Sequence, residues 1–232
     1  MKLIEQEREQ LLAHWTRVFR RNPCWFTSPP PQLTSVLSPN TPDRGMAVRK
    51  FHDKVGFCAK GRVQTGGLCA GTIFRTAAFI DLPQEARSGA RPRSGASLPT
   101  IHIEHTVPAN VLARELASKV DAGASLEVGL AWLLKHSVTT AMKKGQDADF
   151  LKGVTRTTTA FNLCPEEAEK PFKRYSKLFA AKERVWDVWN RSEIDPDEMT
   201  FVLHFETVLS ILHEAGADKA FIKKLEAAGR GL

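Results

Sequence analysis

Hydrophobic positions along this chain recur mostly at intervals of three and four residues, the spacing of one helix face. Over Leu3–Arg21 this pattern predicts an amphipathic helix, which Asn22–Pro23 ends because the residue before a proline disfavours helical backbone. Met46–Phe57 is ambiguous and is compatible with a short helix. Further helices are expected over Asn110–Val120, Leu126–Lys144, from Pro165 to Tyr175 and on to Trp189, Thr200–Ala215 and Asp218–Ala228.

Shorter β-prone segments interrupt the helices in the middle of the chain. Glycines between residues 57 and 82 separate Arg62–Gln64 from Thr72–Ile80, which indicates a hairpin or small sheet. Thr100–His105 is expected as a strand, and Val154–Leu163 as a strand that meets the helix opened by Pro165. Loops or turns are expected over Thr27–Arg44, which holds five prolines, over the Ser-, Gly- and Arg-rich Gln84–Leu98, and over Ser192–Glu198.

Together these elements predict an α+β fold, mostly helical, with a small central β element. The expected organisation is an N-terminal helix and proline-rich loop over 1–45, a core over 46–175 and a C-terminal helical lobe over 176–232. A single domain that spans all three segments is the alternative, since 232 residues suit either arrangement.

Charge changes this picture by pointing to a partner. The chain has 33 Lys and Arg against 26 Asp and Glu, a net charge of +7, and a basic balance favours polyanions, chiefly nucleic acid. Part of the excess lies between Lys50 and Arg93, directly before the strand at Thr100–His105. No apolar run approaches a membrane span and the N-terminus is too charged for a secretory signal, which favours a cytoplasmic protein.

The four cysteines do not change this expectation. None of them forms a CxxC pair, so the usual spacing of a structural zinc site is absent, and free thiols are expected. Cys58 and Cys69 flank the glycine-rich turn and could face each other across the hairpin, but a cytoplasmic setting disfavours a disulfide between them.

Candidate chemistry concentrates in Thr100–Pro108, which reads TIHIEHTVP. Side chains alternate along a strand, so His102 and Glu104 are expected on one face and His105 on the other. A carboxylate beside a histidine at a strand end can hold a divalent cation and activate water. The run Glu104-His105-Thr106-Val107-Pro108 resembles the first motif of the HNH, or His-Me finger, nucleases, in which an acidic residue, a histidine and a proline follow one another in this spacing.

This resemblance implies a ββα-metal-like site. His105 would be the general base and Glu104 a metal ligand, with Mg²⁺ the expected ion and Mn²⁺ or Zn²⁺ as alternatives. His102 would bind metal or phosphate. A second strand should lead into a helix where Asn or His completes the metal site; Asn162 is favoured there over His136, and a helical insertion over 110–144 would separate the halves.

The function implied is a metal-dependent endonuclease, with DNA favoured over RNA. A restriction or phage-defence role fits this family by analogy, and such enzymes often act as homodimers. Arg156, Lys173 and Arg174 could grip phosphates or could simply be solvated, and Tyr175 could stack on a base or anchor packing. The expected contacts with nucleic acid are Arg62, Arg75, Arg91, Arg93, Arg156, Lys173 and Arg174.

The sequence is compatible with three alternatives. The same basic surface could serve a non-catalytic nucleic-acid-binding or adaptor protein. His102 and His105 could instead cleave RNA without a metal, as a toxin does, by acid–base chemistry that uses the ribose 2′-hydroxyl. Finally, the histidines could simply satisfy backbone groups at a structural strand end.

Overall fold

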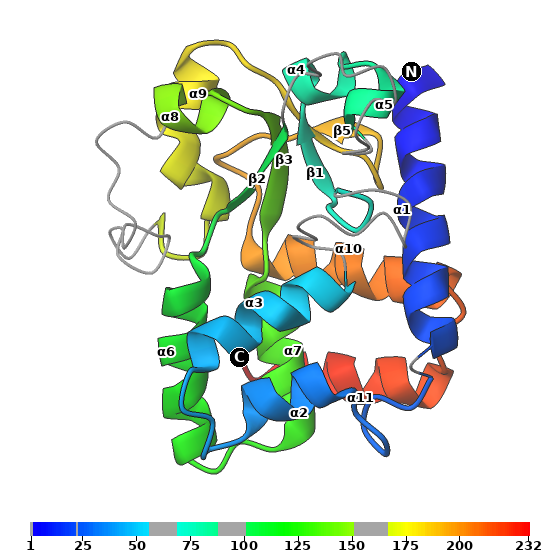
Figure 1. Cartoon of the computed structure of the whole chain (residues 1–232), viewed down its shortest axis with the longest axis vertical. Helices are drawn as coiled ribbons and strands as arrows, with labels where there is room; N and C mark the ends of the chain where they lie inside the picture. The colour runs from blue at the N-terminus through cyan, green and yellow to red at the C-terminus, as the bar shows by residue number, and fades with distance from the viewer. Residues whose placement is uncertain (1, 22, 56–68, 88–100, 151–166) are drawn as a thin grey trace.

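The protein folds around a five-stranded mixed sheet with a layer of helices at one end of it (Figure 1). The structure is a computed structural model, and it describes residues 2–21, 23–55, 69–87, 101–150 and 167–232, without the side chains of residues 147 and 150. Helices dominate and the strands are few and short. The predicted α+β class is therefore confirmed.

The sheet brings together strands that are distant in the sequence. The strands are β1 (Phe74–Thr76), β2 (Ile101–His105), β3 (Thr139–Lys143), β4 (Val185–Asp187) and β5 (Ser192–Glu193). Their order is β2-β3-β1-β4-β5, so β2 lies at one edge. β1 and β3 are parallel, whereas the pairs β2–β3, β1–β4 and β4–β5 are antiparallel. The sheet thus takes strands from both the 46–175 and the 176–232 segments.

Most of the predicted long helices are present. The C-terminal pair has the expected signals: Thr200 and Asp218 accept hydrogen bonds from backbone N–H groups of the following turn, and Gly216 has a φ of +83° after the first helix. The longer helices are α1 (Lys2–Arg21), α3 (Arg44–Val55), α6 (Ala109–Asp121), α7 (Leu126–His136), α10 (Phe201–Glu214) and α11 (Lys219–Gly229). None of the helices in the described ranges is long and apolar enough to cross a membrane.

Two predictions in the first half of the chain are wrong. The loop expected over Thr27–Arg44 contains helix α2 (Pro31–Leu37), because Pro31 stands at the start, where its missing N–H costs nothing. The long strand expected over Thr72–Ile80 stops at Thr76, whose side chain accepts a hydrogen bond from Phe79 N and so begins the short helix α4 (Ala77–Ile80). Residues 56–68, the other side of the predicted hairpin, lie outside the described residues.

Later predictions fail where one helix was expected to continue. The helix predicted over Leu126–Lys144 ends at His136, and the buried, β-branched Thr139 and Thr140 then begin β3. The helices predicted from Pro165 to Trp189 are replaced by the 3₁₀ helix η4 (Pro171–Tyr175), helix α9 (Ser176–Ala180) and strand β4.

Smaller differences concern the predicted loops. Gln84–Arg87 forms helix α5 at the start of the predicted basic loop, and the rest of that loop lies outside the described residues. The turn predicted over Ser192–Glu198 begins with β5. The strand predicted over Val154–Leu163 is likewise outside the described ranges. Helix α8 (Gln146–Phe150) follows β3 directly.

Apolar side chains pack against both faces of the sheet. The larger core contacts one face through Phe74, Met142 and Tyr175 and continues among the long helices. The smaller core covers the other face with Ile4 of α1, Phe79 and Ile80 of α4, and Ala141 of β3. Each face therefore provides an apolar setting in which a charged group needs a partner.

Candidate functional site on strand β2

The histidine and carboxylate of the motif meet on one face of the edge strand. In the register of β2 with β3, His102 stands opposite Met142 and Glu104 opposite Thr140. The His102 Nε2 atom lies 3.2 Å from Glu104 Oε2, and the two side chains are 35% and 16% exposed. The predicted sharing of a face is thus confirmed, and the pair is half-open to solvent.

Arg174 joins this pair from a distant part of the chain. Helix η4 places Arg174 so that its Nη2 atom donates to Glu104 Oε1 across 3.2 Å. The guanidinium is buried, with 5% of the side chain exposed. The Glu104 carboxylate therefore lies between an imidazole on one oxygen and a guanidinium on the other, which holds it in one orientation. We call His102, Glu104 and Arg174 the β2 cluster.

Tyr175 closes the inner side of this cluster. Its hydroxyl lies 2.9 Å from Thr106 Oγ1, the next residue on the same face of the strand after Glu104. Burial, and secondarily the neighbouring Glu104 charge, raise the pKa of Tyr175 above its ordinary value of 10, so the phenol stays neutral. This side chain is fully buried, as expected of a packing anchor.

His105 points to the other face and meets a second histidine. Its ring stacks on that of His52 from α3, with centroids 5.2 Å apart and planes inclined by 17°. The His52 Nε2 atom lies 2.9 Å from Ser137 Oγ. Burial, and secondarily the neighbouring His105, lower the pKa of His52 well below 6.5, so the two rings do not form a doubly charged pair near neutral pH.

The β2 cluster offers part of a metal site. An N···O separation of 3.2 Å between His102 and Glu104 is close to that of two adjacent ligands about 2.0–2.2 Å from one cation. Within the described ranges no group of three or more His, Cys, Asp or Glu is arranged to hold a metal ion. The predicted ligand Asn162 lies outside the described residues. His102 and Glu104 fit a cation that takes its other ligands from elsewhere.

His136, the alternative to Asn162, is a core residue. Its Nδ1 atom lies 2.8 Å from Trp132 O within α7, and its ring stacks on Trp132. Burial lowers the pKa of His136 to about 3. Its ring also contacts Phe201 of α10, so the contacts of His136 are those of a packed core residue.

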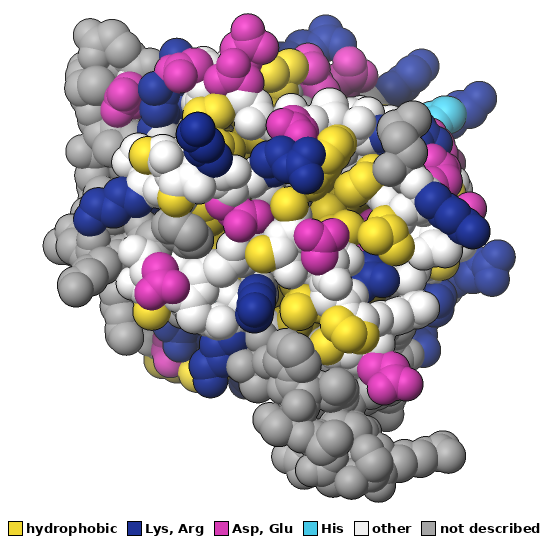
Figure 2. Space-filling view, turned by 90° about the horizontal axis from the view of Figure 1, so that it is seen from above, with side chains coloured by type: hydrophobic (Ala, Val, Ile, Leu, Met, Phe, Trp, Pro, Cys, Tyr) yellow, Lys and Arg dark blue, Asp and Glu magenta, His cyan; other side chains and the backbone are white. Residues whose placement is uncertain are grey.

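The predicted nucleic-acid contacts fall in different places. Arg75 is buried on the opposite face of the sheet and pairs with Glu7, so it is not a surface cation. Lys173 pairs with Asp197, which raises the lysine pKa. Figure 2 shows Lys and Arg interleaved with Asp and Glu on the face that it displays, instead of one basic patch. Arg62, Arg91, Arg93 and Arg156 lie outside the described residues.

Sequence reasoning named Arg174 for phosphate contact but did not foresee its bond to Glu104, and it missed His52 and Ser137 entirely. No local pattern could have found these partners, because they are distant in sequence and packing brings them together. Comparison with protein-family models, with curated proteins and with solved structures gives no match.

Proposed function

We propose that this protein is a metal-dependent endonuclease that hydrolyses phosphodiester bonds at the end of β2, with DNA favoured over RNA. The observation that supports this most is the contact of the Glu104 carboxylate with His102 Nε2 and Arg174 Nη2, one residue before His105. A carboxylate, two imidazoles and a guanidinium thus occupy one strand end, in the Glu-His-x-x-Pro motif that resembles HNH nucleases. The antiparallel pair β2–β3 followed by α8 also has a strand–strand–helix order, with α6 and α7 inserted.

Each residue of the proposal has a separate role. His102 Nε2 and Glu104 Oε2 would hold the cation, which when bound supplies Lewis-acid stabilisation of the developing charge. His105 would take the proton from the attacking water, as a neutral imidazole can near pH 7, and this role requires its ring to turn from its stack on His52 toward the face of Glu104. Arg174 orients Glu104 through Oε1 and brings a positive charge next to the site. Arg174 is therefore a positioning residue in this scheme.

A second candidate follows from the same contact. A carboxylate bonded to an imidazole orients the ring and stabilises its charged form, which suits His102 to general acid–base work without a metal. Such an enzyme would cleave RNA, since the ribose 2′-hydroxyl supplies the nucleophile. The two candidates differ in which histidine is essential and in the need for a metal.

The deciding experiment incubates the full chain with supercoiled plasmid, single-stranded DNA and RNA, each with Mg²⁺, Mn²⁺ or EDTA. We expect metal-dependent cutting that falls by about 10²-fold or more in His105→Ala, the range for loss of a general base. His213→Ala is the matched control, because His213 is an exposed histidine on α10. Circular dichroism and thermal melting of each variant separate lost chemistry from lost fold.

Other results of this cleavage assay would point to a different function. Full activity in a folded His105→Ala variant refutes the assigned base. RNA cleavage that persists in EDTA and is lost in His102→Ala establishes the metal-free candidate instead. Binding of nucleic acid without cleavage under any metal assigns a non-catalytic binding or adaptor role.

The proposal also covers the biological role, the location and the oligomeric state of the enzyme. A restriction or phage-defence role, a cytoplasmic location and a homodimer that cuts two strands are its expectations. Sedimentation of the chain with and without a short duplex measures the last of these, since a dimer that forms only on the duplex would double the bound mass.

A further inference from the structure

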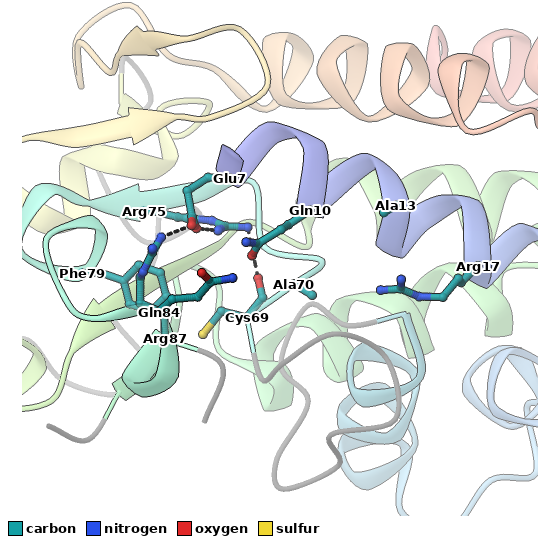
Figure 3. Close-up of a pocket in the computed structure, with 10 residues that line it drawn as sticks. All are labelled: Glu7, Gln10, Ala13, Arg17, Cys69, Ala70, Arg75, Phe79, Gln84 and Arg87. Carbon is teal, nitrogen blue, oxygen red and sulfur yellow. Dashed lines mark hydrogen bonds and ion pairs between the residues drawn. The ribbon is translucent and has the colours of Figure 1, made fainter. Parts of the chain in front are cut away.

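A second charged cluster surrounds a cavity on the other side of the sheet (Figure 3). The cavity lies between one face of α1, strand β1, and the short helices α4 and α5, and its volume is about 240 Å³. This is smaller than the roughly 300–1,000 Å³ of pockets for drug-sized ligands. The cavity therefore suits a small group. Its lining includes Glu7, Gln10, Arg17, Arg75, Gln84 and Arg87.

The cavity wall carries more positive than negative charge. Glu7 is the only carboxylate among the described lining residues, and it pairs with both Arg75 and Arg87. The side chains of Glu7, Arg75 and Arg87 are all buried, with 2%, 2% and 9% exposed. A guanidinium stays protonated in proteins, so one buried carboxylate faces two buried cations at this end of the cavity, while Arg17 lines its far end (Figure 3). An anion in the cavity would offset this excess in a medium of low dielectric.

The two buried arginines differ in how many of their N–H groups already donate hydrogen bonds within the protein. Arg75 is engaged by its own chain: its Nε donates to Thr72 O, and its Nη2 donates to Thr72 O and Cys69 O. Arg87 donates through Nη1 to Glu7, while its buried Nε has no hydrogen-bond partner within the described part of the chain. A buried donor left in this state costs stability unless something accepts from it.

From these observations we infer that the cavity is a binding site for a phosphate group, held by Arg87 and framed by the Glu7–Arg75 pair. The fork of an arginine side chain matches phosphate oxygens, and the cavity has room for one such group. Glu7 and Arg75 set the position of Arg87 and are positioning residues. The phosphate could be free or carried on a nucleoside monophosphate, and the inference does not rest on the proposed nuclease activity.

The test measures binding by the full chain in EDTA, so that a metal at the β2 cluster plays no part. Inorganic phosphate, a nucleoside monophosphate, sulfate and chloride are compared at matched ionic strength by calorimetry and by thermal melting. We expect phosphate or the monophosphate to bind and to raise the melting temperature above that in chloride. Arg87→Gln should weaken binding by about tenfold or more, the equivalent of one charge-assisted hydrogen bond.

Controls locate the site. Arg230→Gln changes an exposed arginine of α11 that pairs with Glu226, and His102→Ala changes the β2 cluster; both should bind as the unchanged protein does. Equal affinity for free phosphate and monophosphate identifies the free anion as sufficient, and tighter binding of the monophosphate identifies a carried group.

Three results would overturn the inference: no binding of any of these anions beyond chloride, unchanged binding in a folded Arg87→Gln variant, or equal loss in His102→Ala. If Arg87→Gln does not fold, Arg87→Lys decides, because lysine keeps a positive charge beside Glu7 but lacks the arginine fork. Unchanged phosphate affinity in that variant overturns the assignment.

Discussion

Each face of the sheet holds a carboxylate fixed by arginine, and the two clusters differ in burial and in balance. Glu104 is 16% exposed and has one guanidinium and one partly exposed imidazole. Glu7 is 2% exposed and has two guanidinium groups, one from each of Arg75 and Arg87. The first cluster is open and balanced, so its carboxylate can exchange partners. The second is closed and has excess positive charge, so its carboxylate cannot be removed without leaving two cations unpaired.

The largest effect should come from Glu7→Gln. This change leaves both buried arginines without their counterion, and breaking a buried pair typically lowers the free energy of unfolding by about 3–5 kcal/mol. Urea denaturation measures it. Glu214→Gln is the matched control, because Glu214 pairs with Arg8 at the surface and a surface pair contributes about 1 kcal/mol or less. If Glu7→Gln lowers the free energy of unfolding no more than Glu214→Gln does, the Glu7 cluster is not the more strongly buried and charge-dependent of the two.

Glu104→Gln should be milder in stability and severe in function. The amide keeps an oxygen for Arg174 but loses the charge, and the penalty expected for a partly exposed group is about 1–3 kcal/mol. Nuclease activity should fall with it, whereas phosphate binding at the Arg87 cavity should not change. Measuring cleavage, phosphate affinity and urea stability on one preparation tests this separation. Parallel loss of all three readouts would mean that the faces act as one unit.

The free energy of unfolding should decrease at acid pH because of the buried histidines. Burial lowers the pKa of His52, that of His204 to about 4 and that of His136 to about 3, all below the ordinary 6.5. The unfolded chain therefore binds more protons between these values and 6.5. Stability is full above pH 6.5 and falls as the pH decreases, by up to about 1.4 kcal/mol per pH unit for each group.

His52→Gln isolates the histidine that stacks on His105, and urea denaturation at pH 7.5, 6 and 5 measures the slope. The slope of stability against pH should be shallower in this variant, by up to the equivalent of one proton, and His213→Gln on the surface of α10 is the matched comparison. An identical slope in the unchanged protein and in His52→Gln would show that His52 does not titrate with folding.

The smallest expected effect is that of Tyr175→Phe. Removing the hydroxyl breaks its bond to Thr106 Oγ1 and should lower the free energy of unfolding by about 1–2 kcal/mol. Thermal melting measures it, with Phe179→Leu as a control on packing in the neighbouring helix. Cleavage activity should remain, since the Tyr175 hydroxyl bonds to Thr106 and has none of the roles proposed for His102, Glu104 and His105. Loss of activity with stability intact would instead assign Tyr175 to the chemistry.

Local patterns predicted the parts of the fold that local physics decides. The helical periodicity of Leu3–Arg21, the alternation in Thr100–His105 and the caps at Thr200 and Asp218 all correspond to observed elements. The end of helix α7 at His136 could not be predicted, because the apolar residues of Leu126–Lys144 are compatible with a buried strand as well as with a helix. The sequence likewise could not show that Arg75 would be buried against Glu7, since that pairing requires α1 to lie along the sheet.

In the candidate site, too, some contacts could be predicted from local geometry and others depend on tertiary packing. The shared face of His102 and Glu104 follows from strand geometry alone and could be predicted. Arg174 on Glu104 and His52 under His105 depend on how η4 and α3 pack, and the sequence contains no local signal for either contact.

The central strand of the sheet is synthesised long before one of the two strands that pair with it. β1 lies at the centre, between β3 and β4, and Phe74 pairs with Asp187, roughly 110 positions later in the chain. On a ribosome, β1 therefore emerges long before one of its neighbours exists. We expect nascent chains that end before Val185 to keep an open strand edge, a species prone to aggregation and a natural client for chaperones.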